Sequence, residues 1–371
     1  MHQEILPLRH LPVLLKSFNS QTEPRCLRQV STSARQKKNK RVDRSADLFE
    51  AVSPEVENFL EDAGNQLPED CPPGHRAGYV AIIGKPNAGK STLLNGILGQ
   101  KLSIVTAKAQ TTRHRIIGLH SEDNFQIIFL DTPGVLREPS TAEPLNMLDQ
   151  RMMQNVRQAT KDADAVLVIV DANDRPEEAL PMLQPFCRKG SVPLAVILNK
   201  VDLLTALRLR QLVEYFEAQP GIDTVIPISA LKARNLQDVE DWAVSHLPEG
   251  PALYPKDAVS EHPERFFVGE IVREKIFQLY REEIPYSSTV QVLDYKERAV
   301  GKDLVQVAVY VEHESQKGIM VGRGGSALKA MATAARADIE AFVGRPVYLE
   351  IVVKVKEKWR KNEEALTNLG Y

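Results

Sequence analysis

The sequence predicts an α/β domain with a mainly parallel sheet and helices on both faces, followed by a smaller α+β domain. Three observations support this prediction. Apolar runs of strand length alternate with helical segments between residues 78 and 248, a stretch with three Pro interrupts the pattern at 249–264, and a different order of helices and strands fills 265–371. Strands that are apolar throughout and alternate with helices are typical of a parallel sheet covered on both faces.

An N-terminal extension precedes these domains. Residues 1–42 contain nine Lys and Arg against two Glu, although the whole chain has a net charge of −2. Such a basic, acid-poor segment with several hydroxyl side chains predicts a removable organelle-targeting peptide. A disordered arm that binds nucleic acid is the alternative. Residues 43–77 are acidic and contain several Pro, so we expect a mostly irregular lead-in with one helix near 54–63.

The composition excludes two classes of protein. No run of about 18 apolar residues occurs, so the sequence predicts no transmembrane helix. The three cysteines are far apart and odd in number, which indicates neither a disulfide framework nor a metal cluster and fits a reducing compartment.

The first functional motif follows the predicted strand at 79–83 and opens a helix. It fits the pattern G-x-x-x-x-G-K-[ST] and consists of Gly84, Lys85, Pro86, Asn87, Ala88, Gly89, Lys90 and Ser91, with Thr92 continuing into the helix. In this context the pattern predicts a phosphate-binding P-loop, whose backbone N–H groups and helix N-terminus bind phosphate oxygens. We expect Lys90 to reach the β- and γ-phosphates and Ser91 to ligate Mg²⁺.

Two further motifs are expected near the γ-phosphate. Asp131, Thr132, Pro133 and Gly134 end the predicted strand at 125–130. Asp131 can hold Mg²⁺ through a water, and the Gly134 N–H can bond the γ-phosphate. Upstream, Thr111 and Thr112 each offer a hydroxyl that can complete the Mg²⁺ shell, and we favour Thr112 over Thr111. The predicted metal ligands are therefore Ser91, Thr112 and Asp131, and the predicted catalytic groups are Lys90, Thr112 and Gly134.

The base is predicted by a fourth motif, Asn199, Lys200, Val201 and Asp202, which follows the predicted strand at 193–198. A carboxylate at Asp202 accepts two hydrogen bonds from N1–H and the 2-amino group of guanine, and adenine lacks that amino group. A fifth motif, Ser229 and Ala230, adds a backbone N–H for the guanine oxygen. The predicted cofactors are therefore GTP or GDP with Mg²⁺, and the predicted activity is hydrolysis of GTP to GDP and phosphate.

Val135 follows Gly134, where Ras-type GTPases have a glutamine that orients the attacking water. A valine cannot form that hydrogen bond, so we expect slow intrinsic turnover and name no general base. A chain that binds nucleotide without hydrolysing it remains an alternative.

The C-terminal segment predicts an RNA-binding module. A helix at 266–283 and strands at 288–296 and 304–312 precede a helix–loop–helix at 316–343 and a strand at 347–355. The loop has the pattern G-x-x-G in Gly322, Arg323, Gly324 and Gly325. This order is that of a KH domain, whose loop binds about four nucleotides of single-stranded RNA. Arg323 and Lys329 supply charge, and Ile319, Val321 and Leu328 are expected under the bases.

Two points in this segment stay open. The helix–loop–helix also fits another αβ module. Trp359, which stands among basic residues near the end of the chain, is either an RNA-stacking residue or a packed side chain on a solvated strand end.

A GTPase domain followed by a KH module resembles the Era family. The resemblance covers residues 78–371. It rests on Lys-Ala-Gln-Thr-Thr-Arg-His (108–114), the motifs at 131–134 and 199–202, Ser-Glu-His-Pro-Glu-Arg-Phe-Phe-Val (260–268), Glu-Ile-Val-Arg-Glu-Lys-Ile-Phe (270–277) and Asn-Leu-Gly-Tyr (368–371). The loop at 322–325 departs from the family pattern by an extra glycine and a single cation.

The resemblance implies a G domain over 78–248, a linker over 249–264 and a type II KH domain over 265–371. It also implies binding to the 3′ end of small-subunit ribosomal RNA during assembly of the small ribosomal subunit, with the GTP form competent for RNA. We expect a monomer with peripheral membrane contact. The leader and the residues at 260–277 favour the chloroplast stroma, with the mitochondrial matrix as the alternative. A GTPase that acts on a protein or membrane partner is the competing function.

Overall fold

The computed structural model describes residues 71–106, 108, 110–135, 146–179 and 192–371. All of them belong to one compact unit, Gln66–Tyr371. The predicted leader at 1–42, the helix expected near 54–63 and the lead-in up to residue 70 lie outside the described residues.

The first domain is built on a six-stranded sheet with the strand order β2-β3-β1-β4-β5-β6. The strands are β1 (Arg76–Gly84), β2 (Ile116–Ser121), β3 (Phe125–Asp131), β4 (Ala165–Asp171), β5 (Leu194–Asn199) and β6 (Thr224–Pro227). Every neighbouring pair is parallel except β2 and β3, which are antiparallel at one edge. All residues of β3 and β5 are buried, as expected for strands covered on both faces. The mainly parallel sheet predicted from the apolar runs is therefore confirmed.

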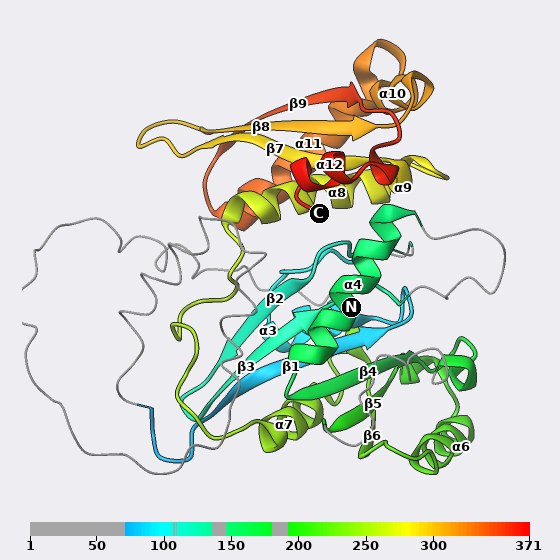
Figure 1. Cartoon of the computed structure of the whole chain (residues 1–371). Helices are drawn as coiled ribbons and strands as arrows, with labels where there is room; N and C mark the ends of the chain where they lie inside the picture. Colours follow the sequence, from blue (N-terminus) through cyan, green and yellow to red (C-terminus); the bar gives the residue numbers. More distant parts are fainter. Residues whose placement is uncertain (1–70, 107, 109, 136–145, 180–191) are drawn as a thin grey trace, which may run out of the picture. The chain divides into compact units, whose positions relative to one another are not determined.

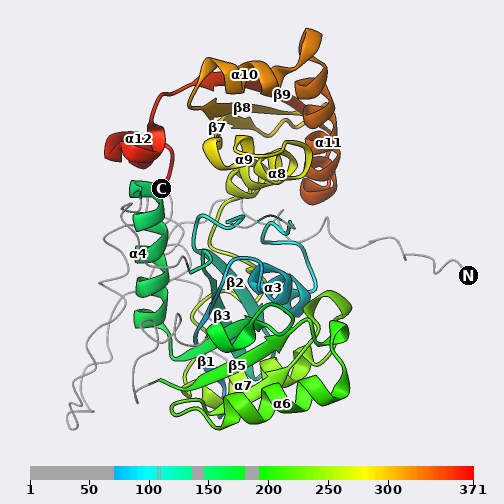
Figure 2. The same ribbon diagram turned by 90° about the vertical axis from the view of Figure 1, so that its right-hand side faces the viewer.

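Helices cover both faces of this sheet (Figures 1 and 2). They are α3 (Lys90–Leu98), α4 (Met147–Asp162), α6 (Ala206–Glu217) and α7 (Leu236–His246). Helices α3 and α7 share one hydrophobic cluster with the sheet, to which they contribute Leu93, Leu94 and Trp242. Helix α4 lies on the opposite face (Figure 2). It starts where Asn146 accepts a hydrogen bond of 3.0 Å from the Asp149 N–H, which satisfies one of the free donors of the first turn.

The second domain packs two long helices on a three-stranded sheet of order β7-β8-β9 (Figure 1). Its elements are α8 (Glu264–Leu279), α9 (Ile284–Ser287), β7 (Thr289–Lys296), β8 (Asp303–Val311), α10 (Glu314–Val321), α11 (Ser326–Val343), β9 (Val347–Val355) and α12 (Glu363–Asn368). Strand β8 is antiparallel to β7 and parallel to β9. Alternate residues of β8, such as Val305, Val307 and Val309, are almost completely buried and join the cluster formed with α8 and α11. The order of elements is that predicted for a KH domain.

Two boundaries differ from the sequence predictions. The single helix expected at 266–283 is wrong, because α8 ends at Leu279 and a separate turn, α9, starts at Ile284. The chain leaves the helical conformation at Tyr280, whose φ and ψ are −100° and 158°, and Glu282 has a φ of +51°. Strand β1 starts at Arg76, where we expected irregular structure, because Arg76 and Ala77 pair with the first residues of β3.

Candidate functional site

The predicted phosphate loop connects β1 to α3, and two of its glycines are required by close contacts. A Cβ atom on Gly84 would lie 2.4 Å from the carbonyl oxygen of Ile169. Gly89 has a φ of +102°, and a Cβ there would lie 2.1 Å from Nδ2 of Asn199. Gly89 precedes α3 without a side-chain cap, so the first N–H groups of the helix remain available to an anion.

Lys90 is buried at the start of α3. Its Nζ donates hydrogen bonds to the carbonyl oxygens of Gly84 at 3.1 Å and Lys85 at 2.9 Å. Burial lowers the pKa of Lys90 to about 8, and the nearby Asp131 carboxylate opposes this effect. An ammonium group held in this way gains from a phosphate oxygen that restores its lost solvation.

Three oxygen-bearing side chains converge beside Lys90. The Ser91 hydroxyl donates to Oδ2 of Asp131 at 2.8 Å and lies 3.0 Å from the Thr112 hydroxyl. The Thr111 hydroxyl instead donates to the carbonyl oxygen of Lys108 at 2.8 Å. Of the two threonines considered from the sequence, only Thr112 makes this contact with Ser91 within the described residues.

The chemistry of this group fits Mg²⁺. Asp131 is fully buried, and its Oδ1 makes no hydrogen bond of normal geometry with any described residue. Burial raises the pKa of Asp131, and the nearby ammonium group of Lys90 opposes this effect. A buried carboxylate oxygen with two neighbouring hydroxyls supplies the hard donors that Mg²⁺ prefers.

The segment after Asp131 returns to the phosphate loop. The Thr132 hydroxyl donates to the carbonyl oxygen of Ile82 at 2.7 Å, and the Val135 N–H donates to that of Gly84 at 3.0 Å. A Cβ on Gly134 would lie 2.8 Å from backbone atoms of Pro86, so only glycine fits there. Val135 is buried.

The motif after β5 forms the opposite end of the site. Nδ2 of Asn199 donates to the carbonyl oxygen of Ala88 at 2.8 Å, and its Oδ1 accepts from the backbone N–H groups of Lys200 and Ala230 at 2.8 and 2.9 Å. One amide side chain therefore joins the phosphate loop to both of the loops predicted to contact the base.

Asp202 is held in place by two neighbours. Its Oδ1 accepts from the Ser229 hydroxyl at 2.7 Å, and its Oδ2 lies 3.1 Å from Nζ of Lys232. The hydrogen bond from Ser229 and the contact with Lys232 hold the pKa of Asp202 below its usual value. The side chain is therefore an ionised acceptor at neutral pH.

Several residues of this site were not identified from the sequence. Nζ of Lys200 lies 2.5 Å from Oδ2 of Asp171, which orients the lysine, and Lys232 contacts Asp202. The position of Asp171 at the carboxyl end of β4 was a usable signal, because ligands bind at that edge of a parallel sheet. Leu203 and Leu231 are exposed and line the same cavity as the five motifs, although neither belongs to a motif predicted from the sequence.

All five motifs line one cavity of about 500 Å³. They reach it because β1, β3 and β5 are parallel and their carboxyl ends meet at the same edge of the sheet. The volume is that of a pocket for a nucleotide-sized ligand.

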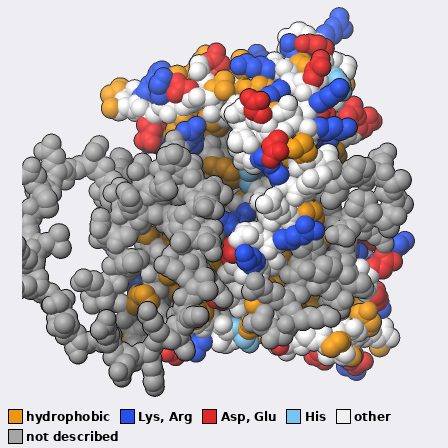
Figure 3. Space-filling view, viewed as in Figure 1, with side chains coloured by type: hydrophobic (Ala, Val, Ile, Leu, Met, Phe, Trp, Pro, Cys, Tyr) orange, Lys and Arg blue, Asp and Glu red, His pale blue; other side chains and the backbone are white. Residues whose placement is uncertain are grey.

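The glycine loop of the second domain lies between α10 and α11. A Cβ on Gly322 would lie 2.7 Å from Cβ of Ala327, whereas Gly324 and Gly325 have positive φ and open space around their Cα atoms. Arg323 and Lys329 are exposed, as is Ile319, while Val321 and Leu328 are half-buried. Basic and acidic side chains are interspersed on the described surface of this domain in Figure 3.

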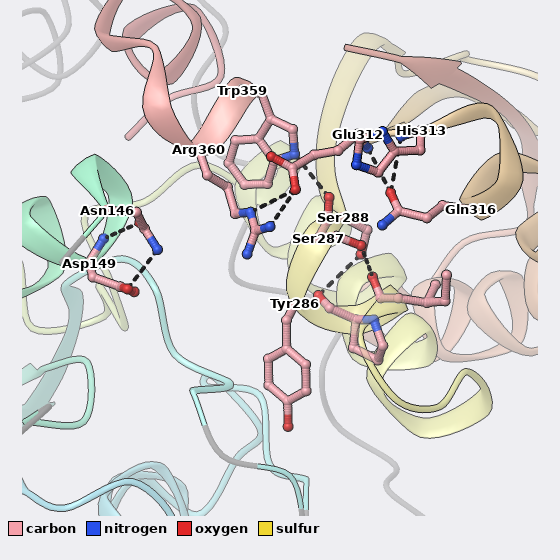
Figure 4. A network of polar contacts seen from close by, with 12 residues as sticks. Asn146, Asp149, Tyr286, Ser287, Ser288, Glu312, His313, Gln316, Trp359 and Arg360 are labelled. Atoms are coloured by element: carbon pink, nitrogen blue, oxygen red, sulfur yellow. Dashed lines mark hydrogen bonds and ion pairs between the residues drawn. The ribbon is translucent and has the colours of Figure 1, made fainter. Parts of the chain in front are cut away.

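Trp359 belongs to the core and not to the exposed surface. Its side chain is fully buried, and Nε1 donates to the carbonyl oxygen of Ser287 at 2.9 Å (Figure 4). Of the two hypotheses for this residue, packing is correct and stacking on RNA is wrong.

Comparisons with known proteins agree with both domains. A family described as a 50S ribosome-binding GTPase matches residues 79–200, and a KH domain family matches 283–360. The chloroplastic GTPase ERA1 of Zea mays is 49% identical over 344 residues, which are 92% of this chain and 79% of the relative. A chloroplastic GTPase ERA-like protein of Oryza sativa subsp. japonica is 52% identical over 299 residues, which are 80% of this chain and 70% of the relative.

Two solved structures are also similar. One is Era in complex with MgGDPNP and nucleotides 1506–1542 of 16S ribosomal RNA, and the other is a variant of Aquifex aeolicus Era bound to GDP·AlF4⁻. Each has a TM-score of 0.74 and 38% identity, over 80% of this chain and 99% of the solved one. Within the ranges that the structure describes, no helix is long and apolar enough to cross a membrane.

Proposed function

Because the chain belongs to the Era family of GTPases, we propose that it is a GTP-controlled switch that binds the 3′ end of small-subunit ribosomal RNA and assists assembly of the small ribosomal subunit. One observation carries the proposal. The same compact unit contains a guanine-nucleotide pocket and a KH domain whose glycine loop has open space around it. The similar Era structure that holds both MgGDPNP and a 16S ribosomal RNA fragment supports the choice of RNA.

The roles proposed for the pocket follow its geometry. The phosphate loop, Gly84 to Thr92, holds the phosphates, and Lys90 neutralises the β- and γ-phosphate charge. Ser91, Thr112 and Asp131 hold Mg²⁺ directly or through water, because their oxygens converge at one point. When bound, Mg²⁺ supplies charge stabilisation for the transferred phosphoryl group.

The remaining motifs complete the switch and the base site. The backbone N–H of Gly134 contacts the γ-phosphate, so that Thr132 and Pro133 sense its loss. Asn199, Lys200 and Asp202 recognise guanine together with Ser229 and Ala230, because a single amide fixes these loops to each other. The loop from Gly322 to Gly325 and the side chain of Lys329 contact the RNA backbone.

Turnover by this site is slow in the proposed mechanism. Val135 is buried and apolar, so its side chain cannot orient a water by hydrogen bonding. Hydrolysis therefore depends on how well Lys90, Thr112 and Gly134 position the γ-phosphate.

The proposal extends to cellular location and organisation. The names of the curated relatives favour the chloroplast, and we place the protein in the stroma as a monomer with peripheral membrane contact. The proposed domains are a transit peptide at 1–42, a lead-in at 43–77, a G domain at 78–248, a linker at 249–264 and a type II KH domain at 265–371.

An RNA titration tests the function. The chain without the proposed transit peptide is titrated with a short RNA that copies the 3′ end of small-subunit ribosomal RNA, in the presence of GDP or a non-hydrolysable GTP analogue. A scrambled RNA is the control, and the salt is fixed because backbone affinity depends strongly on it. We expect tight, sequence-selective binding with the GTP analogue and weaker binding with GDP. Equal, weak binding of every RNA would favour a GTPase that acts on a protein or membrane partner.

A further inference from the structure

Described residues between Lys101 and Arg115 contact both the nucleotide pocket and the second domain. Residues in the middle of this segment, such as Thr106, Gln110 and Thr112, line the cavity. Other side chains of the same segment contact α8 and the turn that follows it. Nζ of Lys101 lies 2.5 Å from the Glu274 carboxylate. Nζ of Lys108 donates to the carbonyl oxygens of Phe277 and Tyr280.

Arg113 makes the most extensive of these contacts. Its guanidinium group donates to the carbonyl oxygens of Ser288, Pro285 and Tyr286 at 2.7, 3.0 and 3.1 Å. The side chain is 3% exposed, and the guanidinium carbon lies 5.9 Å from the ring centroids of both Phe277 and Trp359. The acceptors are carbonyl oxygens in α9 or just after it. The last carbonyl groups of a helix have no N–H donor within the helix, so a side chain from elsewhere can satisfy them. Arg113 therefore serves as a side-chain cap for a helix of the other domain.

The end of the chain closes over the same place. The Tyr371 ring stacks on His114 with centroids 4.6 Å apart, and its hydroxyl lies 3.0 Å from that of Thr289. The Tyr371 hydroxyl also accepts from Arg113 at 3.3 Å. The main-chain oxygen of Tyr371 accepts a hydrogen bond from Arg151 on α4. Figure 4 shows the neighbouring contacts by which Trp359 and Arg360 attach this tail to Ser287 and Glu312.

Thr112 and Arg113 are adjacent, so a movement of one is transmitted to the other through a single planar peptide bond. Thr112 lies 3.0 Å from Ser91 in the pocket, while Arg113 is fixed in α9. We infer that Arg113 is a positioning residue, which holds the Thr112 hydroxyl beside Ser91 by anchoring it to the second domain and so makes GTP hydrolysis depend on that domain. The inference rests on the role in Mg²⁺ binding proposed above for Thr112.

The consequence is a two-way coupling between the domains. If docking of Arg113 into α9 favours the conformation of Thr112 that binds Mg²⁺ and the γ-phosphate, then GTP favours docking by the same factor. GDP lacks the γ-phosphate and gains little from Thr112. Loss of the anchor should therefore weaken binding of GTP and not of GDP.

The test compares Arg113→Met with Thr112→Ala and with the double variant. Arg113→Met keeps an unbranched side chain and removes the hydrogen bonds to α9. Arg115→Met is the matched control, because Arg115 belongs to the same segment but its guanidinium group lies 3.8 Å from the Asp162 carboxylate and, among the described residues, donates no hydrogen bond to α9. For each variant we would measure kcat, the Kd for GDP, the Kd for a non-hydrolysable GTP analogue and the thermal midpoint, and Arg113→Lys would test rescue by charge.

We expect Arg113→Met to lower kcat by roughly 10- to 100-fold, as for a catalytic group displaced by about 1 Å. Its GDP affinity should change less than about twofold, its preference for the GTP analogue should collapse, and Arg113→Lys should restore part of both. The losses in Arg113→Met and Thr112→Ala should not add in the double variant, because both remove the same interaction.

Three outcomes would overturn the inference. They are an unchanged kcat in Arg113→Met, losses that add fully in the double variant, and an equal loss of GDP and GTP affinity at an unchanged thermal midpoint. If Arg113→Met instead lowers the thermal midpoint, which indicates a folding defect, the same criteria apply to Arg113→Lys. If Thr112→Ala itself left kcat and GTP affinity unchanged, the proposed role of Thr112 would fail, whereas an effect of Thr112→Ala without one of Arg113→Met would reject the inference alone.

Discussion

A Cβ atom on Gly89 would lie 2.1 Å from Nδ2 of Asn199, so the phosphate loop and the loop after β5 touch at a point where no side chain fits. The contact exists because Asn199 also bonds to the neighbouring carbonyl oxygen of Ala88. The two loops are therefore in direct contact, and each fixes the position of the other.

Gly89→Ala should abolish this fit. The change forces apart the amide of Asn199 and the loop, and it places alanine at a φ of +102°, which alone costs about 1–2 kcal/mol. We expect GTP affinity to fall by at least roughly tenfold, measured by fluorescence titration with a labelled nucleotide. Gly99→Ala is the control at the other end of α3, because Gly99 also has a positive φ but open space around it. Equal effects of the two substitutions on GTP affinity would contradict the role of the contact.

Asp202→Asn should change base selection. The ionised carboxylate accepts from the two guanine donors, and an amide cannot accept both. We expect GTP affinity to fall by about 5- to 150-fold, which corresponds to about 1–3 kcal/mol for unsatisfied polar groups, while the affinity for the xanthine nucleotide rises. Competition binding of the two nucleotides measures both effects. An unchanged preference for guanine would show that Asp202 does not contact the base.

Replacement of Gly324 and Gly325 by Asp should weaken RNA binding and spare GTP binding. Both positions are open to solvent space and would place carboxylates beside RNA phosphates. We expect RNA affinity to fall by roughly tenfold or more at low salt, with GTP affinity unchanged within about twofold. Gly301→Asp is the control for one such substitution, because it adds one negative charge at a positive φ, in open space between β7 and β8. Intact RNA binding in the double variant would reject the KH loop as the RNA site.

Acid should destabilise the described unit through His262. Burial lowers the pKa of this histidine, whose Nε2 lies 3.1 Å from the carbonyl oxygen of Arg115 and whose ring stacks on Phe266. The unfolded chain therefore takes up a proton near its ordinary pKa of about 6.5, while the folded chain takes it up only at lower pH. The contribution of His262 to the free energy of unfolding is therefore fully present above about pH 6.5. It is lost as the pH falls toward the pKa of His262 in the folded state.

The measurement is the thermal midpoint between pH 7 and pH 5 for the wild-type chain and for His262→Gln, which keeps a hydrogen-bond donor but does not titrate. We expect a shallower fall in the variant. Parallel curves would mean that another group carries the acid dependence.

The sequence predicted the fold of the nucleotide domain, because the signals for its mainly parallel sheet and its loops are local in sequence. Lys90 stands in a pattern typical of a phosphate-binding loop, Asp131 ends a predicted strand, and the apolar run at Ala165–Val170 is typical of a strand buried on both faces. Such patterns involve residues that are close in the sequence, so they can be recognised before the fold is known.

The contacts of Arg113 could not be predicted in the same way. An isolated arginine after two threonines is usually a solvated side chain, and its acceptors are backbone carbonyls that exist only after α9 has formed. Trp359 was ambiguous for a similar reason, since its basic neighbours in sequence say nothing of the buried carbonyl at Ser287. Tertiary contacts to the backbone leave no residue pattern, so sequence reasoning misses them.

The position of β1 has a consequence for how the chain is made. β1 comes first among the described strands, yet it lies in the interior of the sheet between β3 and β4, and Ala230 lies beyond β6. A ribosome that has released only the first half of this domain has therefore exposed a phosphate loop without Asn199 or Asp202 to complete it. We expect the complete pocket to form only after β5 and β6 have joined the sheet, because Asn199 ends β5 and Ala230 follows β6.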